Sequence, residues 1–393
     1  MAPTARIAVL LPRFSLYGGA EQFGYRLAEG LAGRGHCVDF ICSRQEAPAP
    51  PGVRVISIGR PPGARLFKML CFLARAERLR AQGAYDLTVG LGKSLRQDLV
   101  RMGGSPLNIY WKYSEQAVPP GYRRVLKSLR RRLSPSNLLT LFLERRAFGP
   151  ESRVIAVSDL TRKQLLSAYP ALNPDNVAVV YNRPDTTRFG PPSPAERRKA
   201  RRTLLREHAP HFASDPDNLI LIGTASTNFR LKGLDRLIQA TALLPDNVLL
   251  LAAGGRKAAA YLNPARSLGI ERRVVFMGKT ENMPAFYQAL DLFALPTFSD
   301  ACSNAVLEAL ASGCRTLSSS ADGAAFFLDG EAVLEDPSDV EELARRIMLL
   351  LGKPAPAGFN PPPGVACGLD DFMDRLEHLL EERSRIDLFT FAP

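Results

Sequence analysis

Two acidic residues in the second half of the chain stand at a spacing that suits one elongated ligand. Asp300 and Glu308 are separated by seven residues and sit on or just before one predicted helix. A rise of about 1.5 Å per residue then puts them about 12 Å apart, on roughly the same side. The carboxylate pair of a glycoside hydrolase needs about 5–9.5 Å. The spacing therefore favours a ligand such as a nucleotide sugar, although two ordinary exposed acids would give the same pattern.

Groups that bind phosphate lie between and before these acids. Ser303, Asn304 and Ala305 are predicted to leave backbone N–H groups open for a diphosphate. Arg230 and Lys232 follow a predicted strand and precede a helix, so both are placed to neutralise an anion. A solvated basic turn would look the same, and one motif leaves both interpretations open.

The glycine pair Gly18–Gly19 lies between the first predicted strand and a helix. Adjacent glycines allow a tight turn and let a ligand approach the helix N-terminus closely. The dinucleotide fingerprint G-x-G-x-x-G is absent here. Taken alone, the pair is equally well explained as a plain tight turn.

These residues lie in loops of an alternating strand and helix pattern. Strands of the first half are predicted at Ile7–Pro12, Cys37–Cys42, Val53–Ile58, Asp86–Leu91, Asn108–Trp111, Val154–Ser158 and Val177–Asn182. Those of the second half are predicted at Leu219–Thr224, Val248–Ala253, Val274–Met277, Leu292–Leu295 and Arg315–Ser318. Apolar strands separated by helices indicate parallel sheets covered on both faces. We therefore expect an α/β fold of two doubly wound, Rossmann-like domains with a cleft between them, and ligands at the carboxyl ends of the strands.

Two Pro-rich stretches interrupt the alternation, at residues 183–218 and 353–364. They predict a first domain over residues 1–185 and a linker with a basic helix over 186–217. A nucleotide-sugar-binding domain is then expected over 218–360, followed by a C-terminal helix and tail over 361–393.

Composition excludes several classes of protein. The 393 residues are 46% hydrophobic, 23% charged and 8% aromatic, unlike disordered, collagen-like or disulfide-framework chains. The longest apolar runs fall short of the about 20 residues that cross a bilayer, and residues 1–6 show no leader pattern, so we expect a cytoplasmic chain. The six cysteines form no C-x-x-C motif and accompany no histidine cluster. Reduced core thiols and no metal site are predicted.

Three of these features resemble the motifs of a known enzyme family. Asp300…Glu308 resembles the E-x7-E motif of the retaining family 4 glycosyltransferases, which have the GT-B fold. Phe229–Asp235 resembles their basic R…KG-[VL]-D turn, and Gly18–Glu21 their GG-A-E loop. Further segments agree in order between residues 6 and 351, namely Val154–Ser158, Tyr181–Asp185 and Val275–Gly278. Within the family, the spacing is most similar to lipopolysaccharide core glucosyltransferase I.

The resemblance implies a role for each motif residue. Glu308 would bind the ribose hydroxyls and Asp300 a hydroxyl of the donor sugar. Arg230 and Lys232 would stabilise the departing diphosphate, and Gly19 would approach it from the first domain. Backbone N–H groups would be donated to it by Ser303, Asn304 and Ala305, and Gly18 would also belong to the donor site. The resemblance also implies a C-terminal helix that crosses back to the first domain, and a reaction without metal or cofactor.

The activity implied is a retaining transfer of glucose from UDP-glucose to a lipopolysaccharide core or related glycolipid. The alternative within the family is another donor, UDP-GlcNAc or GDP-mannose, in surface polysaccharide synthesis. Two departures from the family pattern affect this expectation. Asp300 replaces the usual glutamate, and the segment Tyr110–Tyr113 stands where many relatives place a histidine after the fifth strand. No general base is assigned.

The charge of the chain is uneven. Lysine and arginine number 51 against 39 acidic residues, a net charge of +12, and residues 101–150 hold ten basic and two acidic residues. Helical spacing and nearby aromatics predict a basic amphipathic helix that faces an anionic membrane on its cytoplasmic side, with the residues Trp111, Arg123, Arg124, Lys127, Arg130 and Arg131. A solvated basic helix or a phosphorylated lipopolysaccharide core as partner remain open.

Two other classes of function compete. An oxidoreductase on paired Rossmann domains would need the missing G-x-G-x-x-G and an acidic residue about 20 positions further on. A non-catalytic nucleic-acid-binding protein would fit the net charge of +12, but the sequence contains no recognised nucleic-acid motif.

Overall fold

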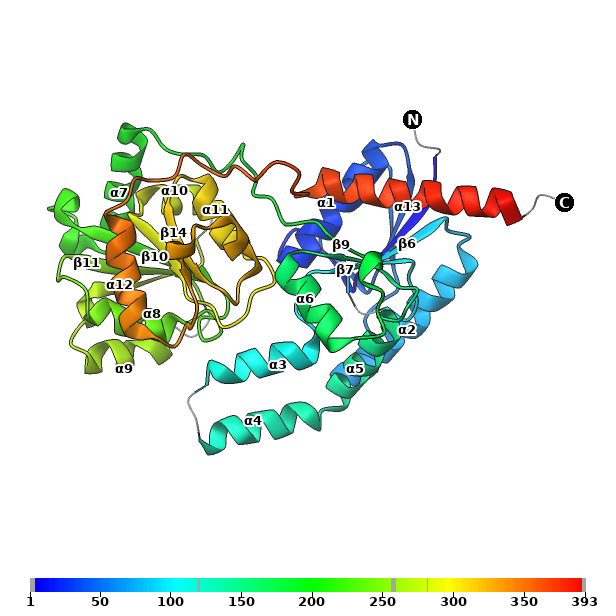
Figure 1. Ribbon diagram of the computed structural model, residues 1–393, viewed down its shortest axis with the longest axis horizontal. Helices are drawn as coiled ribbons and strands as arrows, with labels where there is room; N and C mark the ends of the chain where they lie inside the picture. The colour runs from blue at the N-terminus through cyan, green and yellow to red at the C-terminus, as the bar shows by residue number, and fades with distance from the viewer. Residues whose placement is uncertain (1–3, 93, 119–120, 256–258, 281, 391–393) are drawn as a thin grey trace. The chain divides into compact units, whose positions relative to one another are not determined.

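The computed structural model describes residues 4–92, 94–118, 121–255, 259–280 and 282–390, except the side chains of residues 123, 259 and 384–390. The chain forms two compact units (Figure 1). The N-terminal unit contains the described residues up to 111, from 121 to 182 and from 364 onward. The C-terminal unit contains the described residues of 112–118 and 183–363.

The N-terminal unit is built on a seven-stranded parallel sheet in the order β5-β3-β1-β6-β7-β8-β9. Its strands are β1 (Arg6–Leu10), β3 (Cys37–Cys42), β5 (Val53–Ser57), β6 (Leu87–Gly90), β7 (Leu99–Met102), β8 (Arg153–Ala156) and β9 (Val177–Val179). A short pair, β2 (Arg13–Phe14) and β4 (Arg44–Gln45), lies beside it. The helices are α1 (Gly19–Gly33), α2 (Arg65–Gln82), α3 (Leu107–Gln116), α4 (Tyr122–Arg132), α5 (Pro135–Ala147), α6 (Asp159–Ala168) and α13 (Leu369–Thr390).

The C-terminal unit has a six-stranded parallel sheet in the order β12-β11-β10-β13-β14-β15. Its strands are β10 (Ile220–Ser226), β11 (Val248–Gly254), β12 (Val274–Gly278), β13 (Leu292–Leu295), β14 (Arg315–Ser319) and β15 (Val333–Leu334). Its helices are α7 (Pro194–His208), α8 (Leu234–Ala242), α9 (Ala259–Ser267), α10 (Met283–Ala289), α11 (Asn304–Ala311) and α12 (Val340–Leu351). Counted along the chain, the order is the 3-2-1-4-5-6 of a Rossmann sheet.

Continuous apolar runs make these strands central. Ile7, Ala8 and Val9 of β1 are fully buried, as are Val248 and Leu249 of β11. Strands that are apolar on both faces need helices on both sides, which is the doubly wound arrangement. The predicted fold class is therefore confirmed, with two Rossmann-like units of the GT-B type.

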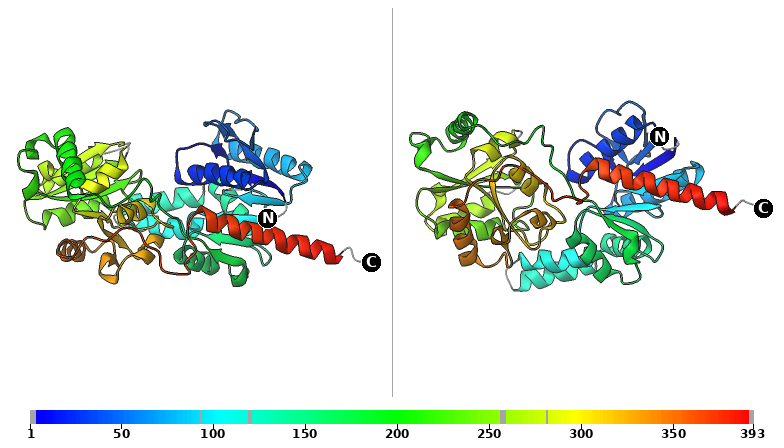
Figure 2. Two further views of the ribbon diagram at one scale, coloured as in Figure 1. Left: turned by 90° about the horizontal axis from the view of Figure 1, so that it is seen from above. Right: turned by 45° about the horizontal axis from the view of Figure 1, so that its top comes forward.

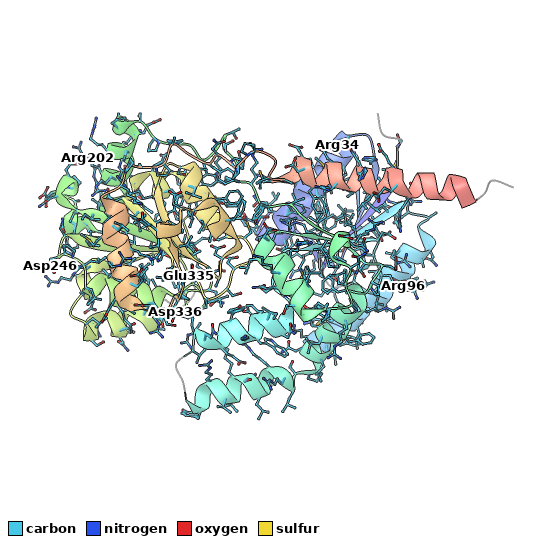
Figure 3. All side chains as sticks on the ribbon, viewed as in Figure 1. Arg34, Arg96, Arg202, Asp246, Glu335 and Asp336 are labelled. Carbon is cyan, nitrogen blue, oxygen red and sulfur yellow. The ribbon has the colours of Figure 1, made fainter. Side chains whose placement is uncertain are left out.

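The C-terminal helix α13 belongs to the N-terminal unit, as expected. Phe372, Met373 and Leu376 join the core cluster that contains Leu27 and Leu31 of α1, and α13 lies along α1 in the views of Figures 1 and 2. Arg34, after the last residue of α1, donates to Asp374 at 2.6 Å and to Glu377 at 3.0 Å. Figure 3 shows Arg34 beside this helix. Apolar packing and ion pairs together attach the end of the chain to its beginning.

The strand predicted at Asn108–Trp111 is wrong, because these residues lie in α3. Aromatic and β-branched side chains favour strands, which is why Ile109–Trp111 suggested one. Pro106 instead precedes the helix, and its carbonyl accepts the N–H of Tyr110 at 2.8 Å. The strand is β7, where the charge of Arg101 interrupts the apolar pattern. The aromatic segment Tyr110–Tyr113 is therefore helical and does not directly follow a strand.

The segment expected as a linker forms part of the C-terminal unit. Its basic helix α7 packs against α10, and the side chain of Arg201 is buried. Arg201 donates to Asp291 Oδ2 at 2.7 Å, and Arg197 donates to Asp291 Oδ1 at 2.8 Å. Because these arginines are bound by a carboxylate, α7 is a packed helix of this unit and not a solvated connector.

The cysteines are free thiols, and most are buried as predicted. Cys37, the first residue of β3, is exposed. Among the described residues, no helix has the length and apolar character that crossing a membrane requires.

Candidate functional site

The chemistry-bearing loops of the C-terminal unit meet at the switch point of its sheet. Strands β10 and β13 are neighbours in the middle of the sheet, and from this pair the strand order runs in opposite directions. Ligands of doubly wound sheets bind outside the carboxyl ends of such a pair. The loop after β10 carries Lys232, and the loop after β13 carries Asp300.

Gly233 holds these two loops together. It has a φ of +70°, in the left-handed region that favours glycine. A Cβ there would overlap the carbonyl oxygen of Pro296. The neighbouring carbonyl of Leu231 accepts the N–H of Phe298 at 2.9 Å and the hydroxyl of Thr297 at 3.2 Å. The glycine of the basic turn thus permits the close approach that places Lys232 next to the second loop.

Lys232 and Asp300 form an ion pair. Lys232 Nζ donates to Asp300 Oδ2 and, at 3.2 Å, to the carbonyl of Ser299. The two side chains are only 16% and 23% exposed, so the pair is largely shielded from water. Arg230 is exposed and instead bonds the hydroxyl of Tyr261 and attracts Asp235. Of the two predicted cations, the structure brings Lys232 to Asp300.

The start of α11 differs in part from the prediction. Ser303 is the N-cap residue, and its N–H donates to Asp322 Oδ1 at 3.0 Å, so this N–H is not open for a ligand. Asn304 and Ala305 are the first two helical residues. The N–H groups at such positions have no carbonyl partner within the helix. Ala305 lies in the first turn of α11, and its contact with a diphosphate stays a prediction.

Glu308 is the fifth residue of α11 and is largely buried. Its Oε2 accepts the hydroxyl of Tyr287 at 3.0 Å, and Tyr287 is fully enclosed. Burial raises the pKa of Glu308 to about 7, against the smaller lowering effects of Tyr287 and Arg188. The carboxyl group is therefore near the midpoint of its titration at neutral pH.

Gly18 and Gly19 open α1 in the N-terminal unit. Gly18 has a φ of +102°, and a Cβ there would overlap the carboxylate of Glu21. Arg13 binds that carboxylate at 2.6 Å. Strands β1 and β6 are neighbours from which the strand order runs in opposite directions. The glycines, which follow β1 in the chain, therefore lie at the switch point of this sheet. The glycines serve a tight turn closed by Glu21 and, at the same time, an exposed helix terminus.

The basic segment forms α3, α4 and α5, and its predicted residues do not share one face. Trp111 lies in α3, and the side chain of Arg123 lies outside the described part of the chain. On α4, Arg124, Lys127 and Arg131 are half-buried, whereas Arg130 is exposed. The opposite face of α4 is apolar and 53–74% exposed, and it consists of Tyr122, Val125, Leu126 and Leu129, with Leu133 just after the helix. We call these five residues the apolar stripe of α4.

Two residues of the site were not found from the sequence. Asp322 lies 22 positions beyond Asp300 and Tyr287 lies 21 positions before Glu308. Neither belongs to a motif, and only the packing of the folded unit shows that they are partners of motif residues. Among the described residues, no group of three or more His, Cys, Asp or Glu side chains could hold a metal ion.

Comparison with known proteins places both units in one class of enzyme. Residues 17–188 match the model for Glycosyltransferase Family 4, and residues 216–353 match the model for Glycosyl transferases group 1. The chain carries two glycosyltransferase domains. With these two domains the chain is a transferase enzyme.

Individual relatives of this glycosyltransferase agree. The D-inositol 3-phosphate glycosyltransferase of Mycobacterium sp. (strain KMS) is 30% identical over 230 residues, 56% of this chain and 49% of that protein. The chain thus spans about half the length of these curated relatives.

Solved structures show the same fold at lower identity. WaaG, a glycosyltransferase involved in lipopolysaccharide biosynthesis, superimposes with a TM-score of 0.72 at 19% identity, over 88% of this chain and 90% of WaaG. HepE of Anabaena, in complex with UDP and glucose, superimposes with a TM-score of 0.69 at 18% identity, over 96% and 99% of the two chains.

Proposed function

We propose that the chain is a retaining glycosyltransferase that moves glucose from UDP-glucose to a lipopolysaccharide core or related glycolipid. The observation that carries the proposal is the Lys232–Asp300 pair at the switch point of the C-terminal sheet, with Glu308 on the helix that follows. A cation beside a helix N-terminus suits a diphosphate, and two further carboxyl groups suit hydroxyls on either side of it. WaaG and HepE, which share the fold, supply the glycolipid and the UDP-sugar as the first candidates.

Each residue then has one role. Glu308 accepts the ribose hydroxyls, and Asp300 accepts a hydroxyl of the donor sugar. Lys232 exchanges its bond with Asp300 for the diphosphate, which also receives the N–H of Ala305. Arg230 would join it only if its guanidinium leaves Tyr261. Gly18 and Gly19 open the N-terminus of α1, a helix terminus of the N-terminal unit that suits an anion.

The reaction breaks the bond between the anomeric carbon and the diphosphate and forms a bond to the acceptor oxygen on the same face. The acceptor proton leaves with the diphosphate or to solvent, because no general base is assigned. The barrier is lowered mainly by electrostatic stabilisation of the leaving diphosphate by Lys232 and the α11 terminus. The proposal includes no metal and no cofactor.

Replacement of Lys232 by alanine tests the proposal. We expect UDP release from saturating UDP-glucose, with a glycolipid acceptor, to fall about 100-fold, since removal of one group that stabilises a transition-state anion has this effect. Lys199→Ala, an exposed lysine on α7, is the matched control and should leave turnover unchanged. Wild-type turnover in the Lys232→Ala variant would rule out the role. A thermal-shift comparison of UDP, GDP and ADP identifies the nucleotide base.

We further propose that α4 docks the enzyme on the cytoplasmic face of an anionic membrane. The apolar stripe of α4 is exposed, and the exposed side chains of Arg130 and Arg132 flank it. Apolar residues that enter the headgroup region between flanking cations are typical of interfacial helices. The structure changes the expected role of the charges, because Arg124, Lys127 and Arg131 lie on the half-buried side.

Co-sedimentation with vesicles tests this docking. Binding to vesicles with anionic lipid should exceed binding to neutral vesicles and fall as salt is added. Replacement of Leu126 and Leu129 by serine should weaken binding at all salt concentrations, because both side chains are exposed and contribute apolar area only when they enter the lipid. Leu243→Ser, an equally exposed leucine of the C-terminal unit, is the control. Equal binding to both kinds of vesicle would contradict the proposal.

A further inference from the structure

Asp322 is a carboxyl group enclosed within the C-terminal unit, where only 2% of the residue is exposed. Its Oδ1 accepts the N–H of Ser303 at 3.0 Å and the N–H of Ala324 at 2.9 Å. Ser303 begins α11, and Ala324 lies in the short 3-10 helix that follows Asp322. One oxygen of this side chain therefore connects the start of α11 to the segment after β14.

The second oxygen of Asp322 lies beside a hydroxyl that has two acceptors within hydrogen-bond distance. The Ser318 hydroxyl oxygen lies 2.8 Å from Asp322 Oδ2 and 3.1 Å from the carbonyl oxygen of Leu295. A hydroxyl has one proton to donate. Both hydrogen bonds form together when Ser318 donates to Leu295 and Asp322 carries a proton on Oδ2 that it donates to Ser318.

The charges around Asp322 favour the same protonated form. The charged groups that face it are Asp300, which pairs with it as an isolated bridge, and Lys232. Lys232 already binds Asp300, so the net charge of these two side chains beside Asp322 is zero. Burial and the negative charge of Asp300 raise the pKa of Asp322 to about 7, against the smaller lowering effects of Lys232 and of the N–H groups of Ala324 and Ser303.

The two residues that flank Asp322 hold the backbone of Asp300. The N–H of Asp300 donates to the carbonyl of Ala321 at 2.9 Å, and the N–H of Gly323 donates to the carbonyl of Asp300 at 3.1 Å. These bonds and the two made by Asp322 Oδ1 fix the segment from Asp300 to Ser303 on both sides. The backbone on either side of Asp322 thus holds Asp300, and the side chain of Asp322 holds the start of α11.

We propose that Asp322 is a positioning residue that acts as a neutral carboxylic acid, ordering the segment from Asp300 to the start of α11 while adding no negative charge beside Lys232. The inference rests on the proposed function in one respect, that an anionic diphosphate binds at Lys232. Ionisation of Asp322 changes the net charge of the three side chains from zero to −1. The affinity for a nucleoside diphosphate then falls as the pH rises through 7.

The protonation of Asp322 is tested without any ligand. Asp322→Asn reproduces the neutral acid, because the amide oxygen accepts both N–H groups and the amide nitrogen donates to Ser318. The raised pKa of Asp322 gives the wild type stability that is complete below pH 4 and is lost as the pH rises through about 7. In urea unfolding between pH 5 and 8, we expect a smaller loss of stability in Asp322→Asn than in the wild type.

The control for this measurement is Asp329→Asn, which removes the same charge from an exposed site in the same segment. Its pH profile should follow the wild type. An Asp322→Asn profile parallel to the wild type, or an Asp322→Asn chain that does not fold at pH 6, would overturn the inference, since both mean that the folded protein needs the ionised form.

The effect on ligand affinity is measured with UDP by calorimetry. Near pH 6 the wild type and Asp322→Asn should bind UDP equally, and at pH 8 the wild type should bind about tenfold more weakly than the variant, from one added charge at close range. The titration of Glu308 acts on both proteins alike and cancels in the ratio. A ratio that stays the same across the pH range would overturn the electrostatic part of the inference.

Asp322→Ala separates positioning from charge. It removes the acceptor of the Ser303 and Ala324 N–H groups, so we expect a raised KM for the donor at pH 6. The KM of Asp322→Asn at this pH should equal that of the wild type. If UDP binds none of the proteins, the proposed donor is wrong, while the unfolding profiles still decide the protonation of Asp322. A donor KM for Asp322→Ala equal to that of Asp322→Asn would overturn the positioning role.

Discussion

Glu308 has surroundings that oppose its charge, and this makes the stability of the protein depend on pH. Its pKa is raised from 4.5 to about 7, with burial as the main cause. The folded state therefore holds this proton more tightly than the unfolded state. The resulting stabilisation is complete below pH 4.5 and is lost as the pH rises through about 7.

We expect Glu308→Gln to flatten part of this profile in urea unfolding between pH 5 and 8. Glutamine keeps the size of the side chain and has no proton to lose, and Asp322 contributes to the slope that remains. Glu341→Gln, at an exposed position of α12, should leave the slope unchanged. A Glu308→Gln slope as steep as that of the wild type would mean that Glu308 is ionised at pH 5.

The hydroxyl of Tyr287 has the opposite effect on the same carboxyl group. Its hydrogen bond lowers the pKa of Glu308, so Tyr287→Phe should move the Glu308 titration to higher pH. The lost hydrogen bond should also cost about 1 kcal/mol of the free energy of unfolding. Urea unfolding at several pH values, of Tyr287→Phe alone and of Tyr287→Phe combined with Glu308→Gln, measures the loss of stability and the shift of the Glu308 titration. Tyr287→Phe should shift the pH midpoint of the stability profile only while Glu308 is present. An unchanged pH midpoint would contradict the effect of Tyr287 on the pKa of Glu308.

At the scale of elements, α7 shows how a helix of basic residues is held by one carboxylate. Asp291 accepts hydrogen bonds from the side chains of Arg197 and Arg201 and from the N–H of Leu221, near the start of β10. Removal of the carboxylate leaves the buried guanidinium of Arg201 without its ionic partner, a change that costs about 3–5 kcal/mol.

We therefore expect Asp291→Ala to lower the free energy of unfolding of the C-terminal unit by that amount, measured by urea unfolding. Arg198→Ala, an exposed arginine of the same helix, should change stability by less than about 0.5 kcal/mol. Asp291→Ala with the stability of the Arg198→Ala control would show that α7 is not fixed through this carboxylate.

The sequence predicted those strands whose side chains are apolar without interruption. Buried strands such as Val248–Gly254 are apolar throughout, so their existence and parallel pairing followed from composition alone. β7 was missed because Arg101 interrupts its short apolar run, and α3 was missed because Ile109–Trp111 favour strands locally. Packing and the preceding proline decide both cases, and neither is visible in local propensity.

Some residues of the candidate site could be predicted from the sequence and others could not, for the same reason. Lys232, Asp300 and Glu308 were found because a motif keeps each at a fixed distance along the chain. Asp322 and the half-buried face of α4 were not, because their surroundings are set by the packing of elements that lie far apart in the sequence. The N–H of Ser303 was expected to be open, and it is occupied by this same Asp322.

At the scale of the whole molecule, the two units differ in how the chain builds them. Apart from residues 112–118, the C-terminal unit is one continuous segment, whereas the N-terminal unit needs both ends of the chain. Phe372, Met373 and Leu376 enter the core that β1 and α1 begin. The N-terminal unit can therefore complete its core only when the last helix is present.

Leu376→Ala tests this dependence. The side chain is fully buried, so its loss should cost about 2–5 kcal/mol, and the cost should fall on the N-terminal unit. Hydrogen exchange of the native protein should show reduced protection in β1 and β3 and unchanged protection in β10 and β11. Ile347→Ala, equally buried in α12, is the matched variant and should give the reverse pattern. If Leu376→Ala reduced protection equally in both sheets, the two units would unfold as one, and α13 would stabilise the whole molecule rather than the core it enters.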